Sequence, residues 1–501
     1  MTFLGLDLGT TGCKATIFSE TGEIRSYAYK EYPVSSPRPG WAEQDPIIVW
    51  DTTREVLRKV SQSRTIAEPI SALSISTQGE AVMPVDENGN PLRDCILGMD
   101  MRAIDEAIWL NETIGGDRLF ALTGVHPHPI TTLAKILWIK RNEPSVFHRA
   151  VRFLLYEEYI FNKLGGVYAT DTTTAARTMM FDINKCCWSD EILEAVDLDS
   201  SRLATVFSPG QPVGTILPEV ADELCLNHGI VLVAGGHDVE CATLGAGGNV
   251  PGVVVNVHGT ADILASAIKP FSIGKDLAEK GFCRHPHVVE GMHMAQSLNQ
   301  SGGLFLQWFR DNFRDETRQT GKGFYDEMMD RLPNAPASVM VLPHLVGSVT
   351  PWPDPRSRAA ILGLTLHASK EEIFHGIVDS VAYDLRNNLE IMEKGGVQCD
   401  EVRMVGGGAK SEYWIQLKAT VLKSPIYTLR IREASCLGAA ILAAVGFGAY
   451  KCTADFVKEA VSVDREFLPD RDLYREYDRR YKIYRELYGS VTPIHHRLAA
   501  L

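Results

Sequence analysis

A short pattern that occurs twice in the chain constrains the fold more than any other feature. Near the N-terminus, the apolar segment 3–8 is followed by the turn Gly9-Thr10 and by a second apolar segment. The same order recurs at segment 253–257 and the turn Gly259-Thr260. A glycine-bearing turn between two apolar runs predicts a β-hairpin. The two turns lie 250 residues apart in a chain of 501 residues. We therefore expect two similar halves, each opening with a hairpin, with a cleft between them.

Strands and helices alternate along the rest of the chain, which indicates an α/β fold. The spacing of apolar residues predicts helices over 48–60, 133–141, 158–164, 241–247 and 370–394, and strands over 70–76, 82–85, 230–234 and 402–405. A short apolar run at 153–155 precedes the helix predicted over 158–164. Residues 248–251, rich in glycine, predict a hinge between the halves. The tail over 470–488 carries mixed charges at helical spacing, which predicts a solvated surface helix.

Composition excludes several classes of protein. The net charge of −13 argues against a nucleic-acid or anionic-membrane binder, which needs a basic surface. Ten cysteines are too few for a disulfide scaffold of this length and indicate reduced thiols. Asp7 interrupts the N-terminal apolar run, so that run is not a signal peptide. The longest apolar run, 437–450, falls short of the ~20 residues that cross a bilayer. We expect a cytoplasmic protein that binds neither membranes nor nucleic acid.

The first turn has the chemistry of an anion site. Backbone N–H groups of the turn and the hydroxyls of Thr10 and Thr11 are donors, and Lys14 adds positive charge. Asp7, at the end of the first strand, is placed to hold Mg²⁺ through water. The alternative is a plain hairpin with an Asp cap. The repeat at Gly259-Thr260 favours a phosphate clamp made from two hairpins.

A second glycine-rich turn, Gly406-Gly407-Gly408, follows a predicted strand. Three glycines allow the backbone to approach a flat ligand such as adenine, although a strand, turn and helix in this order are also common in α/β folds. Ser411 stands where a GxGxxG motif needs glycine, and the chain contains no GxxxxGK[ST] motif. The sequence therefore does not support a P-loop nucleotide site.

Asp238 follows the apolar segment 230–234 within Gly235-Gly236-His237-Asp238. Open α/β folds bind ligands at the carboxyl ends of their strands. An Asp in this place suits a general base that accepts a hydroxyl proton during phosphoryl transfer. The alternative is a helix N-cap.

Polar side chains after two other strand-like runs are candidates for binding hydroxyl groups, namely Gln78, Glu80, Asp100 and Arg102. Asp100 and Arg102 can also form a structural salt bridge with each other. The histidines at 126, 128, 285, 287 and 293 have no fixed ligand spacing, which favours scattered histidines over a metal site.

Taken together, these motifs resemble the FGGY family of carbohydrate kinases, within the actin-like ATPase superfamily. The resemblance covers essentially the whole chain, in order. It rests on DLGTTGCKA at the N-terminus, Asp100-Met101-Arg102, Thr123-Gly124, Lys135 to Trp138, Asp171, Ala175 to Thr178, Gly236-His237-Asp238, Gly259-Thr260, the prolines and glycines of 343–364, and GGGAKSEYW at 406–414. The resemblance implies two ribonuclease H-like α/β domains, each built on a mixed five-stranded sheet, around a deep cleft. Residues 1–248 would bind the sugar and residues 249–501 would bind ATP with Mg²⁺.

The resemblance also assigns roles to individual residues. Asp238 matches the catalytic base, which also lies near the sugar and, with Asp7, near Mg²⁺. The remaining ATP-binding positions are Asp7, Thr10, Thr11 and Lys14 at the first hairpin, Gly259 and Thr260 at the second, and Gly303, Gln307, Gly407, Gly408 and Glu412. The positions on the sugar side are Gln78, Glu80, Asp100 and Arg102.

Departures from the family's patterns bear on the substrate. Glycerol kinases carry aromatic residues at the places of Gly98, Ile130 and Ile263, and Arg at the place of Gly79, so glycerol is not expected. Xylulokinases have Met-His where this chain has Gly79-Glu80, and Asn where it has Val239. The Gly-His-Asp form of the base motif is more similar to the L-fuculokinase-like branch. A pocket widened at Gly79 and Gly98 would suit a five- or six-carbon ketose or a longer polyol.

We therefore expect an enzyme that transfers the γ-phosphate of ATP to a terminal hydroxyl of a xylulose- or fuculose-like ketose. A polyol or sugar-acid kinase is the alternative within the family. Outside it stand an actin-like ATPase without a sugar substrate and a catalytically inactive sugar-binding regulator. The regulator would have lost the base or a hairpin, and the sequence keeps both. Homodimers are frequent in the family, so the resemblance allows one here.

Overall fold

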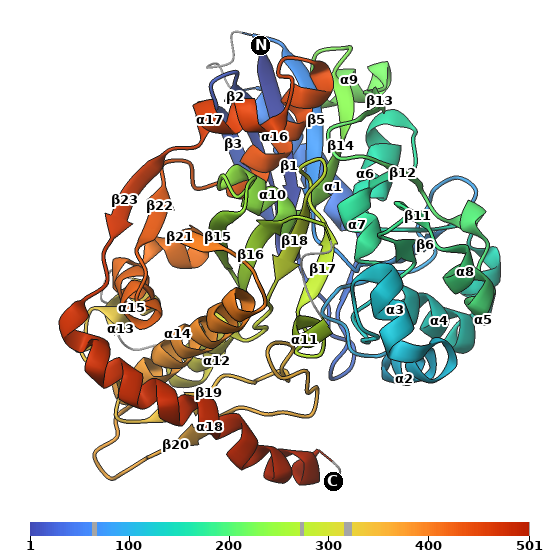
Figure 1. Cartoon of the computed structure of the whole chain (residues 1–501). Coiled ribbons are helices and arrows are strands. Elements are labelled where there is room, and N and C mark those ends of the chain that lie inside the picture. The colour runs from blue at the N-terminus through green and yellow to red at the C-terminus, as the bar shows by residue number, and fades with distance from the viewer. Residues whose placement is uncertain (63–67, 271–274, 315–322, 500–501) are drawn as a thin grey trace. The chain divides into compact units, whose positions relative to one another are not determined.

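A computed structural model describes residues 1–62, 68–270, 275–314 and 323–499 (Figure 1). The chain divides into two compact units. Unit 1 comprises Met1–Asn249, Arg284–Met294 and Glu433–Val461, and unit 2 comprises Val250–Cys283, Ala295–Arg432 and Ser462–Leu501. The chain first passes from one unit to the other inside the predicted hinge, 248–251. The α/β character predicted from the sequence is confirmed in both units.

Unit 1 opens with the predicted hairpin of β1 (Thr2–Leu8) and β2 (Gly12–Ser19). Its other strands are β3 (Ile24–Glu31), β4 (Glu43–Gln44), β5 (Ile70–Thr77), β6 (Met83–Val85), β7 (Cys95–Ile96), β8 (Arg152–Leu154), β9 (Ala169–Asp171), β10 (Phe181–Asp182), β11 (Cys187–Trp188), β12 (Thr205–Phe207), β13 (Pro212–Thr215) and β14 (Val231–His237). Its helices are α1 (Pro46–Ser61), α2 (Ile104–Leu110), α3 (Gly116–Thr123), α4 (Thr132–Asn142), α5 (Pro144–Arg149), α6 (Tyr156–Gly165), α7 (Thr172–Ala176), α8 (Asp190–Val196), α9 (Pro218–Leu224), α10 (Asp238–Gly245), α16 (Ala434–Phe447) and α17 (Thr453–Ala460).

The main sheet of unit 1 has six strands in the order β13-β14-β5-β1-β2-β3. Strands β14, β5 and β1 are parallel to one another, and the hairpin partner β2 is antiparallel to β1. The carboxyl ends of parallel strands meet at one edge of a sheet. This register brings Asp7, Gln78 and Asp238 to the same edge, because each lies at or just after the end of one of these strands.

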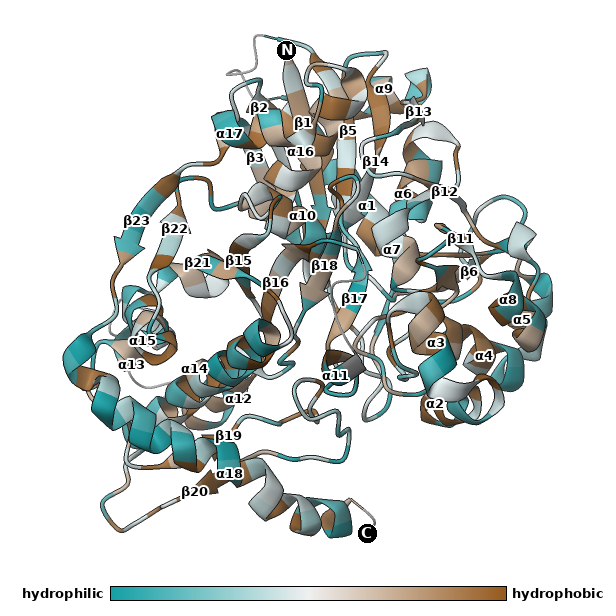
Figure 2. Cartoon of the chain, in the orientation of Figure 1, coloured by the Kyte–Doolittle hydropathy of each residue, from teal (hydrophilic) through white to brown (hydrophobic). Residues whose placement is uncertain are grey.

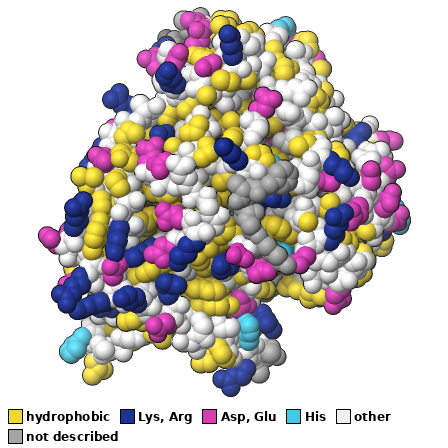
Figure 3. Space-filling model, in the orientation of Figure 1, with side chains coloured by type: hydrophobic (Ala, Val, Ile, Leu, Met, Phe, Trp, Pro, Cys, Tyr) yellow, Lys and Arg dark blue, Asp and Glu magenta, His cyan; other side chains and the backbone are white. Residues whose placement is uncertain are grey.

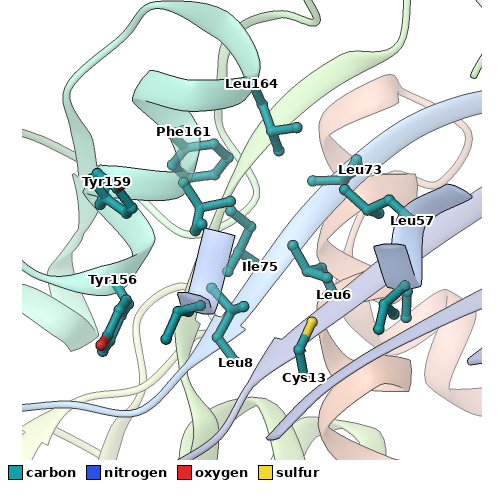
Figure 4. Packing of buried hydrophobic residues seen from close by; sticks show 14 of the residues in the cluster. Leu6, Leu8, Cys13, Leu57, Leu73, Ile75, Tyr156, Tyr159, Phe161 and Leu164 are labelled. Atoms are coloured by element: carbon teal, nitrogen blue, oxygen red, sulfur yellow. The ribbon is translucent and has the colours of Figure 1, made fainter. Parts of the chain in front are cut away.

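Apolar side chains of the sheet and its covering helices form the core of unit 1 (Figure 4). Leu6 and Ile75 project from neighbouring strands, while Leu57 of α1 and Phe161 of α6 project from helices, and all four are fully buried. Figure 2 shows the same concentration of hydrophobic residues along the central strands. Burying a side chain of this size contributes about 1.5–3 kcal/mol, so the core holds the strand ends that carry the polar residues.

Helix α16 is part of unit 1, although the sequence placed its residues in the domain 249–501. It packs against β1, β5 and α10. A side chain at Gly5 would put its Cβ 1.9 Å from the Cys436 carbonyl oxygen, and one at Gly438 would put its Cβ 2.0 Å from the Cys241 carbonyl oxygen. These glycines let the backbones approach closely, which explains the small residues of the apolar run 437–450.

Unit 2 repeats the hairpin with β15 (Gly252–His258) and β16 (Asp262–Ile268). Its other helices and strands are α11 (Lys275–Ala278), α12 (Gly302–Phe313), α13 (Phe324–Met329), β19 (Met340–Leu342), β20 (Ala360–Leu362), α14 (Lys370–Lys394), β21 (Cys399–Gly406), α15 (Glu412–Leu422), β22 (Ile426–Leu429), β23 (Val463–Phe467) and α18 (Tyr474–Leu498). Strands β17 (Cys283–Pro286) and β18 (His293–Gln296) belong to the same sheet, although residues 284–294 are assigned to unit 1.

The second sheet has seven strands in the order β17-β18-β16-β15-β21-β22-β23. Strand β21 is parallel to both β15 and β22, whereas β16 is antiparallel to β15 and β23 is antiparallel to β22. The expectation of five strands in each sheet is therefore wrong, because the sheets have six and seven. The additional strands include short strands at the sheet edges, such as β13 and β17. Their sequences contain proline or polar residues and so lack an apolar strand pattern.

The C-terminal helix α18 differs from the prediction of a solvated surface helix. Figure 3 shows its Lys and Arg side chains gathered on the face in view. Its other face is buried, with Tyr477, Tyr481 and Tyr484 packed in one hydrophobic cluster with residues of α14. The Tyr484 hydroxyl donates to Asp384 Oδ1 at 3.0 Å. The tyrosines recur at helical spacing and form an apolar stripe that the charged residues between them obscured.

Within the described residues, no helix is both long and apolar enough to cross a membrane.

Candidate active site

The first hairpin is a tight turn that neighbouring side chains hold in place. Gly9 N–H donates to the Gly12 carbonyl at 3.1 Å and closes the turn around Thr10 and Thr11. The Thr10 hydroxyl donates to Gln78 Oε1 at 3.3 Å, and Gln78 Nε2 donates to the Gly9 carbonyl at 3.3 Å. Gln78, which the resemblance assigns to the sugar side, thus braces the first hairpin. Thr11 at the tip is exposed to solvent.

Asp7 is a buried carboxylate whose pKa is raised in part by the charge of Asp238. Burial raises the pKa of Asp7 to about 6, against the opposing charge of Lys14 and with help from the charge of Asp238. Ser76 donates to Asp7 Oδ1 at 2.8 Å, and Lys14 pairs with Glu433 at 3.0 Å. Strand β5 separates β1 from β14, so the two carboxylates lie about two strand spacings, roughly 10 Å, apart.

This donor set fits a hydrated Mg²⁺ ion better than a protein cage. Mg²⁺ keeps several of its waters and is usually bound through one or two carboxylates together with substrate phosphates. Asp7 and Asp238 supply two such carboxylates at one sheet edge. Among the residues that the structure describes, no three or more His, Cys, Asp or Glu side chains group as metal ligands.

Asp238 begins helix α10 and keeps 36% of its side chain exposed, so a substrate can reach it. Burial of the rest of the group raises its pKa, although the neighbouring His237 opposes the shift. His237 Nε2 lies 3.3 Å from Asp238 Oδ1, and His237 Nδ1 lies 2.5 Å from Glu240 Oε2. Burial would lower the pKa of His237, but the charges of Glu240 and Asp238 outweigh it and raise the pKa to about 9.

Glu80 lies in the same unit with its side chain paired to Arg177. Its backbone has a φ of 57°, in the left-handed region that favours glycine. Buried Lys135 stabilises this conformation, because its Nζ donates to the Glu80 carbonyl at 2.9 Å. Burial lowers the pKa of Lys135 to about 8, partly offset by the charge of Glu80. Backbone strain of this kind is common at functional sites.

Asp100 and Arg102 form the structural salt bridge that the sequence left open. Both side chains are fully buried, and Arg102 donates from Nε and Nη2 to the two carboxylate oxygens of Asp100 at 2.8 and 2.7 Å. Asp100 also accepts from the Ala42 N–H, and the Arg102 guanidinium stacks 3.7 Å above the Trp41 ring. This pair therefore fixes the loop, with its hydrogen-bonding groups facing the protein.

The predicted widening of the pocket at Gly79 and Gly98 is wrong at Gly79. A Cβ at Gly79 would lie 2.7 Å from His237 Cδ2 and 3.2 Å from Arg177 Cγ, so these side chains fill the space. A Cβ at Gly98 would lie 3.1 Å from the Gly79 carbonyl and 3.6 Å from Glu80 Oε2. The space beside Gly79 and Gly98 is therefore taken up by His237, Arg177 and Glu80.

In unit 2 the second hairpin adjoins the start of helix α12. Gly259 N–H donates to the Ala261 carbonyl at 2.9 Å and closes the turn. The N–H groups of Gly303 and Leu304 donate to the carbonyls of Gly259 and Thr260 at 3.1 and 3.0 Å. A Cβ at Gly303 would lie 2.4 Å from the Gly259 carbonyl oxygen. The sequence-predicted Gly259, Thr260 and Gly303 therefore lie together, and Gly303 is glycine because the hairpin is so close.

The buried ammonium group of Lys418 holds the two strands of this hairpin through their side chains. Lys418 Nζ of α15 donates to Asn256 Oδ1 at 2.8 Å and lies 3.1 Å from both carboxylate oxygens of Asp262. His258 Nδ1 lies 2.8 Å from Asp262 Oδ1. Burial would raise the pKa of Asp262, but the charges of Lys418 and His258 hold it well below its usual range.

The glycine-rich turn after β21 lies beside the same hairpin. Gly406 pairs with His258 in the sheet, and a Cβ at Gly408 would lie 2.2 Å from His258 Cδ2. Gly407 has open space, with the His258 carbonyl 3.9 Å from its Cβ position. Glu412 is exposed and pairs with Arg465 across a small cavity that Gly406, Ala409 and Lys410 also line.

Gln307 of α12 is exposed one turn beyond Gly303. The structure thus brings together Gly259, Thr260, Gly303, Gly407 and Gly408. Gln307 lies further along α12, and Glu412 is the first residue of α15.

Sequence reasoning missed the buried polar residues behind the site. Lys418 lies in an apolar helix and Asn256 and His258 in the apolar strand β15, and these polar positions in hydrophobic runs are the signal that could have found them. Glu240 and His285 gave no such signal, because they come together from segments 45 residues apart in the sequence.

Comparisons with known proteins agree with this arrangement. The family profile described as "FGGY family of carbohydrate kinases, N-terminal domain" matches residues 2–245, and the corresponding C-terminal domain matches residues 255–447. A xylulose kinase of Escherichia coli is 28% identical over 496 residues, covering 98% of this chain and 99% of the relative. A glycerol kinase of Methylibium petroleiphilum is 28% identical over 509 residues, covering 98% of this chain and 100% of the relative.

The crystal structure of a xylulose kinase from Rhodospirillum rubrum superposes with a TM-score of 0.86 at 25% identity, covering 99% of this chain and 100% of that one. The match extends over both halves, which confirms the two-domain α/β fold of actin-like ATPases. The chain belongs to the FGGY family of carbohydrate kinases and is a phosphotransferase with an alcohol group as acceptor.

Proposed function

We propose that this kinase transfers the γ-phosphate of ATP to a terminal hydroxyl of a xylulose- or fuculose-like ketose, with Asp238 as general base. The observation that carries the proposal is the Asp238 carboxylate itself. It lies at the carboxyl end of β14, remains about a third exposed, and has a raised pKa beside His237. A carboxylate with a raised pKa is a stronger base, so it suits the removal of a hydroxyl proton.

The rest of the proposed site acts by positioning and by donating hydrogen bonds. The hairpins at Thr10-Thr11 and Gly259-Thr260 would donate to phosphate oxygens, and Gly407 would let adenine approach the backbone. Asp238 would accept the hydroxyl proton as that oxygen attacks phosphorus in line. Bound near Asp7 and Asp238, Mg²⁺ would supply charge neutralisation of the phosphate oxygens.

The ketose is supported by two observations. Relatives across the full length are named xylulose kinases. The resemblance also implies that Gly98, Ile130 and Ile263 stand where glycerol kinases have aromatic residues, which argues against glycerol. Because His237 and Arg177 fill the space beside Gly79, this position adds no room for a larger substrate, and we expect the polar groups of Glu80 and Arg177 to contribute to the choice.

A coupled ADP-release assay tests the proposal. The panel is D-xylulose, L-xylulose, D-ribulose, L-ribulose, L-fuculose, L-rhamnulose, gluconate, erythritol and glycerol. We expect one ketose to reach a kcat/KM of about 10⁴ M⁻¹s⁻¹ or more. A preference for gluconate or erythritol would establish the sugar-acid or polyol alternative, and a preference for glycerol would contradict the argument from Gly98, Ile130 and Ile263.

A further inference from the structure

We propose that His237 is a positioning residue that sets the direction of the Asp238 carboxylate, with Glu240 and His285 holding His237 in place. This inference rests on the proposed function, in which Asp238 is the base. It starts from the geometry of one imidazole ring. Its Nε2 lies 3.3 Å from Asp238 Oδ1 and its Nδ1 lies 2.5 Å from Glu240 Oε2. Both ring nitrogens therefore face carboxylates, and the ring bridges the exposed carboxylate to a buried one.

The buried end of this bridge is fixed by a second histidine. Glu240 Oε1 lies 2.7 Å from His285 Nδ1, and His285 Nε2 lies 3.1 Å from Arg177 Nη1. A guanidinium group only donates, so His285 Nε2 accepts and its Nδ1 carries the proton that faces Glu240. Glu240 and His285 are fully buried. Each carboxylate oxygen of Glu240 therefore lies close to an imidazole nitrogen in the interior of unit 1, at 2.5 Å from His237 and 2.7 Å from His285.

The backbone at His237 is held as well as its ring. Its N–H donates to Thr173 Oγ1 at 2.9 Å, and the Thr173 hydroxyl donates to Asp171 Oδ1 at 2.6 Å. Glu240 lies three residues after His237, on the same side of the first turn of α10. The chain therefore delivers His237 and Asp238 to the sheet edge on a rigid support.

Gly79 provides the space that the ring occupies. A Cβ at this position would lie 2.7 Å from His237 Cδ2 and 3.0 Å from His237 Nε2. Any side chain at residue 79 would push the ring away from Asp238. The small residue Gly79, in the loop after β5, thus leaves room for the large His237 side chain at the end of β14.

Asp238 needs such a support, because it is the first residue of its helix and a third of its side chain faces solvent. The Val239 N–H also bonds to the carboxylate, so losing His237 removes one of the groups that hold its direction. Displacements of about 1 Å in a catalytic group cost up to about 100-fold in rate. The expected consequence of losing His237 is a lower kcat with substrate binding preserved.

A double-mutant cycle tests the proposal. The four proteins are the wild type, His237→Asn, Asp238→Asn and the double variant, each assayed for kcat, for KM of sugar and ATP, and for sugar binding by calorimetry. We expect His237→Asn to lower kcat 10- to 100-fold and to change both KM values less than threefold. In the Asp238→Asn background, the same change should alter the residual kcat less than threefold, because His237 acts only through Asp238.

Two further variants separate this role from a loss of folding. Gly79→Ala deletes no hydrogen bond, and we expect it to lower kcat in the protein with His237 but not in the His237→Asn background. His228→Asn is the control, since His228 is an exposed histidine that pairs with Asp222 on the surface, and its kcat should match the wild type. Thermal unfolding midpoints of all variants show whether each protein is folded at the assay temperature.

The outcomes distinguish this inference from the proposed function. If His237→Asn lowers kcat by the same factor with and without the Asp238 carboxylate, His237 acts independently and the inference is wrong. An unchanged kcat in His237→Asn contradicts it equally. If Asp238→Asn itself keeps the wild-type kcat, the proposed base is wrong and the inference fails with it.

Discussion

Lys418 is a fully buried cation, and its hydrogen-bond partners Asn256, His258 and Asp262 are side chains of the second hairpin. Its Nζ lies 3.1 Å from both oxygens of Asp262 and 2.8 Å from Asn256 Oδ1. A buried charge is tolerated only where such partners replace water. The hairpin that carries Gly259 and Thr260 therefore depends on one residue about 160 positions away.

Replacing Lys418 with Met leaves the Asp262 carboxylate buried without its cation. Breaking a buried ion pair from one side costs about 3–5 kcal/mol, so we expect the midpoint of urea unfolding to fall sharply. Lys423→Met is the matched control, because Lys423 pairs with Asp478 at the surface, where each side chain is about a third exposed. Such a pair contributes about 1 kcal/mol at most, and equal losses in the two variants would contradict the account.

Helix α12 and the second hairpin form one structural element in practice. The first N–H groups of the helix donate to the hairpin carbonyls of Gly259 and Thr260, and orphan helix N–H groups need such partners. The contact is close enough that only glycine fits at residue 303, where a Cβ would lie 2.4 Å from the Gly259 carbonyl oxygen.

Gly303→Ala should displace the hairpin from the start of the helix. We expect the KM for ATP to rise at least tenfold, with a smaller effect on sugar binding, as measured by ADP release and calorimetry. Gly489→Ala in α18 is the control, because no atom lies within 4 Å of its Cβ position. An unchanged KM for ATP in Gly303→Ala would show that the hairpin does not contact the nucleotide.

The elements themselves could largely be predicted from local patterns. The predicted helix 370–394 is α14 (Lys370–Lys394), and the predicted strand 70–76 is β5 (Ile70–Thr77). The hairpins were recognisable because glycine, threonine and apolar alternation are signals between near neighbours in the sequence. The edge strands that bring the sheets to six and seven lack such a signal, because β13 contains proline and glycine and pairs only through the tertiary fold.

At the scale of the whole chain, the division into units could be predicted only in part. The passage near residue 249 follows from glycine-rich sequence, whereas the return of residues 433–461 to unit 1 depends on the fit of α16 against Gly5 and Gly245. A close approach of backbones far apart in the sequence is a tertiary property. Nothing in the order of the residues marks which small side chains will meet.

In the candidate site, too, local patterns predict some residues, whereas contacts between distant segments could not be predicted. Asp7, Asp238 and the two hairpins lie at strand ends and were found from sequence. The groups that hold them, Glu240 with His285 and Lys418 with Asp262, meet across 45 and 156 residues. Gly79 was interpreted as empty space, and only the structure shows that the ring of His237 fills it. Sequence patterns predict the groups proposed to react, and packing determines how those groups are oriented.

The most direct measurement for the whole account is the sugar-dependent ADP release of Asp238→Asn together with its sugar affinity by calorimetry. A lost general base should lower kcat by about 10²- to 10⁴-fold, while the sugar dissociation constant stays within threefold of the wild type. Retention of more than a third of the wild-type kcat would contradict the assignment of Asp238 as the base. If Asp238→Asn hydrolyses ATP in the absence of sugar at the wild-type rate, that result would also contradict the assignment of Asp238 as the base.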